Sequence, residues 1–385
     1  MHRGSSAAAT RASLDGAPAA LEVPVLPVDR LCAVDVSMST GEPPRITMST
    51  SGDDEDEAAE ELAEWLWSNG SERPFLVASI HGRKLLRRIR GAVGTAVPGR
   101  HATQEWARSC RPAARDADAV VAIGGGRCLD AAKLVAAGVG VPFIAVPTQL
   151  SHDGVCSPVS VLPLVAGSLA ESLEAVAPQL AFFSRPTLVR SPIASLRAGI
   201  GDLIAKPLAL RDWQLASDAG LERIDDAAWE LSAASFRLIE PLLEQPLGTR
   251  SVEPEVVGAL AGALVSSGLA MMRVGTSRPA SGAEHKISHA IDELFGARAY
   301  HGAQVGFACL VSAALHGLDV GGLRRSLMNL ELPHHPRQLG LSNDDMTSVL
   351  LRAPSTRPGR FTILESAALD EPMAARLVRS LWPDL

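Results

Sequence analysis

The chain has 385 residues, 46% apolar and 21% charged, which is typical of a soluble globular protein with room for two domains. Its net charge of −7 and pI near 5.8 argue against nucleic-acid binding, which needs clustered lysine and arginine. The five cysteines are widely spaced without a C-x-x-C pair, so we expect a reduced, cytoplasmic chain with no thiolate metal site. No run approaches ~18 uninterrupted apolar residues, and we expect no membrane span.

The first 50 residues are rich in Pro, Ser, Gly and Ala, and we expect a flexible or weakly structured N-terminal extension over 1–50. They lack the apolar core of a secretory signal, while an amphipathic transit peptide stays open beside a simple tail. Short apolar pieces at 31–34 and 45–48 predict edge strands. The acidic run 53–57 precedes apolar residues at helical spacing, where a helix N-terminus favours negative charge. We interpret this run as a solvated face rather than a cation site.

A buried strand is predicted from Arg73 to Ser79, and His81-Gly82-Arg83 opens a basic helix that continues to Arg90. In many dinucleotide folds an acidic residue near the end of such a strand accepts hydrogen bonds from the adenosine ribose. No carboxylate stands there and several arginines follow, so NADP is permitted at least as well as NAD. The arginines could equally serve solubility, and both interpretations stay open.

A triple glycine, Gly124-Gly125-Gly126, lies between a predicted apolar strand at 118–123 and a helix that starts at Arg127. Glycines let the backbone approach a pyrophosphate, which the free N–H groups of a helix start can bind. The pattern also suits an ordinary turn, and it is not the G-x-G-x-x-G fingerprint. The next strand, 141–147, ends in the polar loop 148–154, where open α/β sheets place ligands. Strand, helix and strand in this order predict parallel pairing.

From about residue 185 the apolar pattern becomes helical. Helices are predicted at 227–239, 254–272, 284–295 and 303–315, and another begins within 199–206. The sequence therefore predicts an α/β N-terminal domain with a parallel sheet at 51–185, followed by an all-α C-terminal domain at 186–385. A cleft between two such domains is a common place for a substrate.

Two histidines, His285 and His289, are spaced i, i+4 on one face of a predicted helix, and His301 follows sixteen residues after His285. This spacing is compatible with a metal site. Ten histidines are scattered through the chain, however, and such a pair is more often ordinary surface or core. The pair alone therefore does not establish a metal site.

Six motifs follow one another between about residues 70 and 370: 123–133, 146–158, 199–216, 277–292, 301–306 and 360–365. Together they resemble the sn-glycerol-1-phosphate dehydrogenases, relatives of dehydroquinate synthase, glycerol dehydrogenase and the iron-containing alcohol dehydrogenases. The resemblance implies a dehydroquinate synthase-like fold, with the dinucleotide in the first domain and metal and substrate in the helical one. The cyclase branch has a glutamate as first metal ligand, whereas Asp202 stands here and favours the dehydrogenase branch.

The resemblance implies that Asp202, His285 and His301 bind a metal. A carboxylate with two imidazoles suits Zn²⁺ with a position open for a substrate oxygen. Iron-type relatives add a histidine one helical turn after the aspartate, but Lys206 stands there, and a protonated lysine cannot ligate. Zinc is therefore favoured over iron, and His289 becomes a neighbour of the site. Without the resemblance, Asp202 could simply be a helix N-cap.

The implied activity is reversible hydride transfer between NAD(H) or NADP(H) and dihydroxyacetone phosphate, giving sn-glycerol 1-phosphate for phospholipid metabolism. Zinc would act as a Lewis acid on the carbonyl, and the cofactor would supply the hydride. The expected roles are pyrophosphate and ribose binding by Gly124, Gly125, Gly126 and Asp130, nicotinamide contact by Thr148 and Ser151, catalysis by Asp153, His289 and Lys206, and phosphate binding by Lys206 and Arg278. For Lys206 and Arg278 the alternative is a structural cation. A homo-oligomer is expected from the family alone.

Two departures from the relatives leave the substrate open. The strand 180–184 ends in a serine where relatives commonly have aspartate, and the adenosine-side strand lacks its acid. One alternative is a zinc dehydrogenase for another phosphorylated or polyol ketone. Another is a cofactor-binding homologue without turnover, against which the complete ligand set argues. A hydrolytic triad around His152-Asp153 is disfavoured because no G-x-S-x-G elbow is present.

Overall fold

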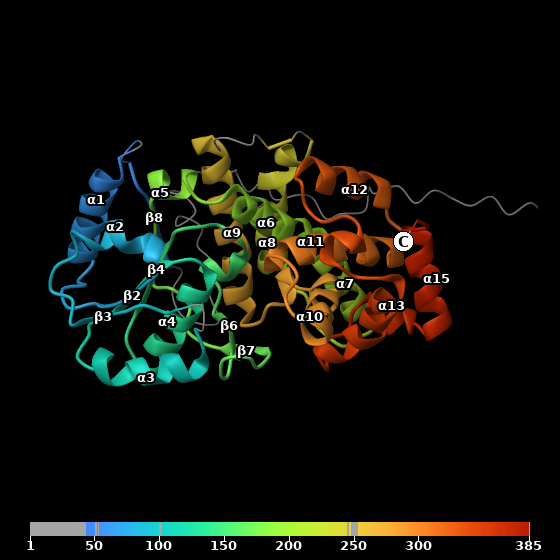
Figure 1. The fold of residues 1–385 in the computed structure, drawn as a ribbon, viewed down its shortest axis with the longest axis horizontal. Coiled ribbons are helices and arrows are strands. Elements are labelled where there is room, and N and C mark those ends of the chain that lie inside the picture. Colours follow the sequence, from blue (N-terminus) through green and yellow to red (C-terminus); the bar gives the residue numbers. More distant parts are fainter. Residues whose placement is uncertain are drawn as a thin grey trace, which may run out of the picture.

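The computed structural model describes residues 44–50, 52, 54–99, 102–244, 246–247 and 253–384. The strand predicted at 31–34 and nearly all of the extension 1–50 lie outside this range. In Figure 1 the sheet and its helices occupy the left half of the molecule and the remaining helices the right half. The boundary predicted near residue 185 falls directly after the last strand of the large sheet.

A six-stranded parallel sheet forms the first half, in the order β1-β8-β5-β4-β2-β3. Its strands are β1 (Arg45–Met48), β2 (Phe75–Ala78), β3 (Gly94–Ala96), β4 (Val120–Gly124), β5 (Phe143–Pro147) and β8 (Leu180–Phe183). The central strands β2, β4, β5 and β8 are buried at every residue, which explains their continuous apolar sequences. The predicted parallel pairing of β4 with β5 and the edge position of β1 are confirmed.

Helices cover both faces of this sheet. They are α1 (Glu55–Ser68), α2 (Arg83–Leu86), α3 (Gln104–Ala114), α4 (Gly126–Val139) and α5 (Arg185–Val189). The apolar side of α1 packs on Leu76, Val121 and Phe182, while α3 and α4 pack on the opposite face. Asp54 caps α1 by accepting from two backbone N–H groups, and three acidic residues fill the first turn as the sequence predicted.

Two elements of this half differ from the sequence prediction. The basic helix expected to continue to Arg90 is a single turn, α2, after the 3-10 turn η2 (Ile80–Gly82), because the chain must turn to enter β3 at Gly94. The antiparallel hairpin of β6 (Val159–Pro163) and β7 (Ala170–Glu174) was not predicted. Its second strand is polar and mostly exposed, so the sequence carries little apolar alternation there.

The second half is helical, as predicted. It contains α6 (Ile193–Ile204), α7 (Lys206–Asp218), α8 (Asp226–Ile239), α9 (Pro254–Val274), α10 (Ala283–Phe295), α11 (His301–Leu315), α12 (Val320–Asn329), α13 (Asn343–Arg352), α14 (Ile363–Ala367) and α15 (Glu371–Leu381). The helix predicted within 199–206 is wrong in its bounds: α6 starts at Ile193 and ends at Ile204, and Lys206 starts α7. Pro207 explains the break, since proline lacks an N–H and is tolerated in the first turn of a helix.

Helix α9 is the one described helix whose length and composition would suit a membrane span, with a mean hydropathy of 1.6. Within the fold, 78% of that apolar window is buried. It lies at the centre of the molecule in Figure 1, between the sheet and the other helices. Its apolar sequence is therefore explained by packing on all sides.

Candidate metal and substrate site

Two glycines allow α6 and α11 to cross closely enough to bring Asp202 and His301 together. A Cβ at Gly302 would lie 2.0 Å from the Ala198 carbonyl oxygen, and one at Gly201 would lie 2.5 Å from the Gly302 carbonyl oxygen. Any larger residue would force the helix backbones apart. Asp202 stands in the last turn of α6 and His301 is the first residue of α11, so this crossing sets the distance between their side chains.

Asp202, His285 and His301 each offer one ligand atom, and these atoms all lie within 4.8 Å of one another. Asp202 Oδ1 is buried without a hydrogen-bond partner and lies 3.5 Å from His285 Nε2. The other ring nitrogen, His285 Nδ1, lies 2.9 Å from Glu284 Oε1, a carboxylate contact that orients the ring. A buried acceptor without a donor is costly, and a divalent cation would satisfy it. The residues present therefore fit a metal ion.

The protonation of this cluster also suits a cation. Burial, reinforced by the charge of His285, lowers the pKa of His301 to about 3. For His285, burial opposes the charged form, but the adjacent carboxylates of Asp202 and Glu284 outweigh it and raise the pKa. Near neutral pH, His301 is therefore neutral and has a lone pair available for a metal. A proton bound to His285 interacts with Asp202, and a metal ion would have to displace that proton.

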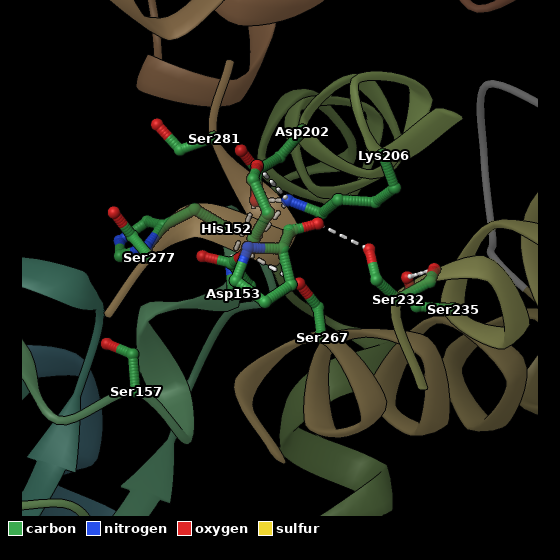
Figure 2. Close-up of polar contacts among 12 residues, drawn as sticks. His152, Asp153, Ser157, Asp202, Lys206, Ser232, Ser235, Ser267, Ser277 and Ser281 are labelled. Carbon is green, nitrogen blue, oxygen red and sulfur yellow. Dashed lines mark hydrogen bonds and ion pairs between the residues drawn. The ribbon is translucent and has the colours of Figure 1, made fainter. Parts of the chain in front are cut away.

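Lys206 and Asp153 form a buried ion pair next to these candidate ligands (Figure 2). Lys206 Nζ lies 2.8 Å from Asp153 Oδ2 and 3.5 Å from Asp202 Oδ2, and it donates to the Ala280 carbonyl at 3.2 Å. Ser267 Oγ also donates to Asp153 Oδ2, at 2.7 Å. Burial disfavours the ammonium charge, but the two carboxylates outweigh it and raise the pKa of Lys206. Lys206 is thus a permanently charged link between the two aspartates.

Further imidazoles surround His301. The ring centroids of His152 and His289 each lie 6.1 Å from that of His301. Burial, followed by the charge of His301, holds the pKa of His289 well below its usual value, so His289 is neutral. His289 does not belong to the set of mutually close ligand atoms found in the described part of the chain.

The glycine turn and the polar loop lie side by side at the carboxyl ends of β4 and β5. Thr148 donates its backbone N–H to the Gly124 carbonyl at 3.0 Å, and no side chain caps the start of α4. A Cβ at Gly126 would lie 2.3 Å from His152 Nε2. Because the His152 ring also approaches His301, the loop connects the glycine turn to the candidate metal ligands. Thr148 and Ser151 lie on this loop and are largely buried.

Comparisons with known proteins show the family to which the chain belongs. The iron-containing alcohol dehydrogenase family matches residues 56–190. The chain is 37% identical over 259 residues to the glycerol-1-phosphate dehydrogenase [NAD(P)+] of Cenarchaeum symbiosum, covering 67% of this chain and 71% of the relative. It is 39% identical over 260 residues to the protein of the same name from Hyperthermus butylicus, covering 68% and 73%. The chain belongs to the glycerol-1-phosphate dehydrogenase family.

The fold of this glycerol-1-phosphate dehydrogenase family member agrees with a solved structure. The glycerol dehydrogenase of Schizosaccharomyces pombe matches it with a TM-score of 0.72 at 19% identity, covering 90% of this chain and 91% of that one. The predicted fold class is confirmed: a parallel-sheet α/β part is followed by a helical part, as in the dehydroquinate synthase-like enzymes.

Two residues predicted to touch ligands have internal partners in this family member. Asp130 is buried in α4 with Lys133 Nζ at 3.7 Å, and that ammonium donates to the carbonyls of Gly154 and Val159 at 2.6 and 2.8 Å. These contacts differ from the ribose contact predicted for Asp130. Arg278 lies 2.8 Å from Glu222 and donates to two backbone carbonyls, as the alternative of a structural cation requires.

Two carboxylates next to the candidate ligands were not singled out from the sequence. Glu284 orients His285, and its Oε2 is buried without a partner. Asp212 accepts from the backbone of Ala283 and Ile363 at 2.7 Å each and from His316 Nε2 at 3.0 Å, which fixes the start of α10. Both residues lie within motifs of the family, and position in those motifs was the available signal.

A cleft of about 1310 Å³ opens between the two halves, at the amino ends of the strands. Its walls include Phe143 of β5, Trp213 of α7 and Met272 of α9, together with Arg278, Arg357 and Arg360. The candidate metal ligands are not on these walls. This cleft is therefore not centred on the residues with metal-binding chemistry.

Proposed function

We propose that the chain is a metal-dependent, NAD(P)-linked oxidoreductase that interconverts dihydroxyacetone phosphate and sn-glycerol 1-phosphate. The observation that carries this proposal is the buried Asp202 Oδ1, which lacks a hydrogen-bond partner in a carboxylate whose ligand atom lies within 4.8 Å of those of two imidazoles. The relatives at 37% and 39% identity bear the name of this activity.

We propose Zn²⁺ as the metal, held by Asp202, His285 and His301. The place of a fourth protein ligand is taken by Lys206, whose ammonium is paired with carboxylates. Three ligands leave a coordination position for a substrate oxygen. When bound, the ion would supply Lewis acidity to the substrate carbonyl.

For the cofactor, we propose that the backbone of Gly124, Gly125 and Gly126 receives the pyrophosphate at the uncapped start of α4. Thr148 and Ser151 would lie along the nicotinamide half, because their loop runs from the glycine turn toward His301. The nicotinamide supplies the hydride, and the chain supplies its orientation. The cofactor would thus lie mainly on residues 51–185 and the metal and substrate on residues 186–385.

Asp153 and His289 are our proposed groups for the substrate hydroxyls. Lys206 and Ser267 both donate to Asp153 Oδ2, and these two contacts fix the orientation of the carboxylate. An ionised carboxylate accepts a hydrogen bond from a substrate hydroxyl and orients it. His289 is neutral and can donate or accept at the same site. In this proposal Lys206 acts through Asp153. We further propose a cytoplasmic homo-oligomer, on family membership alone.

The test follows NADH and NADPH oxidation with small ketones that carry or lack a phosphate, using protein freed of metal and reloaded with Zn²⁺. Dihydroxyacetone phosphate should react only in the reloaded protein, and the product should be the sn-1 enantiomer. Reaction with unphosphorylated ketones only would favour a related polyol dehydrogenase. Metal-independent turnover would contradict the proposal.

His285→Ala should remove both bound zinc and turnover while the circular dichroism spectrum is unchanged. Removing one of three ligands leaves too few for tight binding. His81→Ala, an exposed histidine of η2, is the matched control and should keep both. Zinc content and turnover retained in His285→Ala would overturn the assignment of the site.

A further inference from the structure

Arg357 and Arg360 lie close together in the segment between η7 (Ala353–Thr356) and α14, on the wall of the cleft. Both are half-buried, yet neither forms an ion pair with a carboxylate of the described residues. Arg278, on the same wall, differs because Glu222 lies 2.8 Å from it. A cation that is partly removed from water without a counter-ion is costly, so the pair favours an anion from outside the chain.

The same two arginines converge on two serines that precede α10. Arg357 donates to Ser277 Oγ at 2.9 Å and to Ser281 Oγ at 3.0 Å. Arg360 donates to Ser277 Oγ at 3.2 Å and to the Ser281 carbonyl at 2.8 Å. Within the described chain, neither serine hydroxyl donates its own proton to another residue. The cluster therefore offers guanidinium and hydroxyl donors, which is the composition of an anion site.

This arginine-serine cluster lies beside the candidate metal ligands. Ser281 precedes α10, the helix that carries His285, by two residues. In Figure 2, Ser277 and Ser281 lie on one side of Asp202 and Lys206 approaches from the other. The charges of Arg357 and Arg360 also contribute, after burial and His301, to the lowered pKa of His289. An anion in the cluster would thus lie near the atoms that would react.

We propose that Arg357 and Arg360, with the hydroxyls of Ser277 and Ser281, bind the phosphate of the ketone substrate. This rests on the proposed function and replaces Lys206 and Arg278 as its phosphate groups, because those two cations already have carboxylate partners. In dihydroxyacetone phosphate, one carbon and one ester oxygen separate the carbonyl carbon from phosphorus. A phosphate site beside the metal ligands therefore selects ketones phosphorylated next to the carbonyl over unphosphorylated polyols.

The electrostatics of the pair favour a doubly charged ligand. Burial, followed by the charge of Arg357, lowers the pKa of Arg360 to about 9, so the two guanidinium groups repel each other in the absence of a ligand. A phosphate dianion compensates both charges, and each planar guanidinium can donate two parallel hydrogen bonds to its oxygens. A neutral ketone gains nothing from this arrangement.

The test compares Arg357→Gln and Arg360→Gln with wild type, using dihydroxyacetone phosphate and unphosphorylated dihydroxyacetone as substrates. For the phosphorylated ketone we expect kcat/KM to fall about 10- to 100-fold, the usual cost of a lost charged hydrogen bond. The value for dihydroxyacetone should stay within about twofold, because that substrate makes no such bond. Arg360→Lys should recover part of the loss as a point charge. Arg223→Gln, an exposed residue of the same cleft wall, is the matched control and should behave as wild type.

A binding measurement separates this proposal from the proposed function. Inorganic phosphate is titrated calorimetrically into the zinc-loaded protein, and its Kd should rise about 10-fold or more in either arginine variant. This result would support the phosphate site even if no ketone were reduced. Where an arginine variant fails to fold, Ser277→Ala serves instead. It removes one hydroxyl, which accepts from both arginines and would donate to the phosphate, and its phosphate Kd should rise a few-fold.

Three results would overturn the proposal. Equal losses for the phosphorylated and unphosphorylated ketones would make the arginines structural supports. A loss confined to the KM of NADPH, absent with NADH, would assign them to the cofactor's 2′-phosphate. An unchanged phosphate Kd in all these variants would remove the site altogether.

Discussion

The buried Lys206 and the half-buried pair Arg357 and Arg360 flank the candidate metal ligands, and they differ in their partners. Lys206 is paired with Asp153 and Asp202, and its charge is cancelled inside the protein. Arg357 and Arg360 have only hydroxyl and carbonyl acceptors among the described residues, and their charge is not cancelled. Lys206 therefore has its counter-ions within the fold, whereas we propose that Arg357 and Arg360 receive theirs from a bound anion. The partners of a cation beside a candidate active site therefore indicate whether the cation supports the fold or is available to bind a ligand.

The largest effect in this comparison should come from Lys206→Met. The substitution leaves Asp153 and Asp202 facing each other in the protein interior with no cation, and breaking a buried ion pair on one side typically costs about 3–5 kcal/mol. We expect the free energy of unfolding, measured by urea denaturation of the metal-free protein, to fall by about that amount.

Arg211→Met is the control for Lys206→Met, because Arg211 is an exposed cation on the same helix, α7. Its free energy of unfolding should change by less than about 0.5 kcal/mol. If Lys206→Met unfolded at the wild-type urea concentration, Lys206 would not be the internal partner of these aspartates, and the contrast with the arginines would disappear.

The sequence predicted the fold class and most helices because long apolar periods and buried strands are local signals. The helices at 227–239, 254–272, 284–295 and 303–315 are confirmed to within a few residues. Local signals failed at the β6–β7 hairpin, whose strands are short and partly polar, and at the break before Lys206, where Pro207 had to be weighed against a continuing helical pattern.

Partners of the charged residues could not be predicted in this way. Lys206 meets Asp153 from 53 positions away, and Arg357 meets Ser277 from 80 positions away. Which cation is neutralised depends on how α6, α7, α9 and the segment after η7 converge, and no spacing in the sequence encodes that. The resemblance to a family identified candidate metal ligands. Our prediction for the phosphate was Lys206 and Arg278, and the fold pairs both of these cations with carboxylates.

An intermediate effect is expected in the pH dependence of the free energy of unfolding of the metal-free protein. Here the group compared with the cations is the imidazole of His301. The pKa of His301 falls from the ordinary histidine value of 6.5 to about 3 in the fold. As the pH falls, the unfolded state therefore binds a proton at His301 before the folded state does. The contribution of His301 to stability is fully present above pH 6.5 and is lost as the pH falls toward 3. When the pH is lowered from about 7.5 to about 5.0, His301 should reduce the free energy of unfolding by about 2 kcal/mol.

His285 contributes with the opposite sign, because its raised pKa adds stability at low pH, so the His301 effect must be isolated. The free energy of unfolding is measured at both pH values for wild type and His301→Gln. Wild type should lose about 2 kcal/mol more than the variant. Equal losses would mean that His301 takes up a proton in the folded site.

The smallest effect on the free energy of unfolding should come from Arg360→Gln. This variant tests directly whether the fold depends on Arg360 as it depends on Lys206. The variant loses hydrogen bonds to Ser277 and Ser281, but it also removes the repulsion from Arg357. These terms oppose each other, so the free energy of unfolding should change by less than about 1 kcal/mol.

A difference between wild type and Arg360→Gln should emerge only when ligand is present. Phosphate at about 100 times its Kd should stabilise wild type by about 2.7 kcal/mol, and the same concentration should stabilise Arg360→Gln by much less. Urea denaturation with and without phosphate measures both quantities. A large loss of stability without phosphate would place Arg360 with Lys206, as a cation that the fold itself requires.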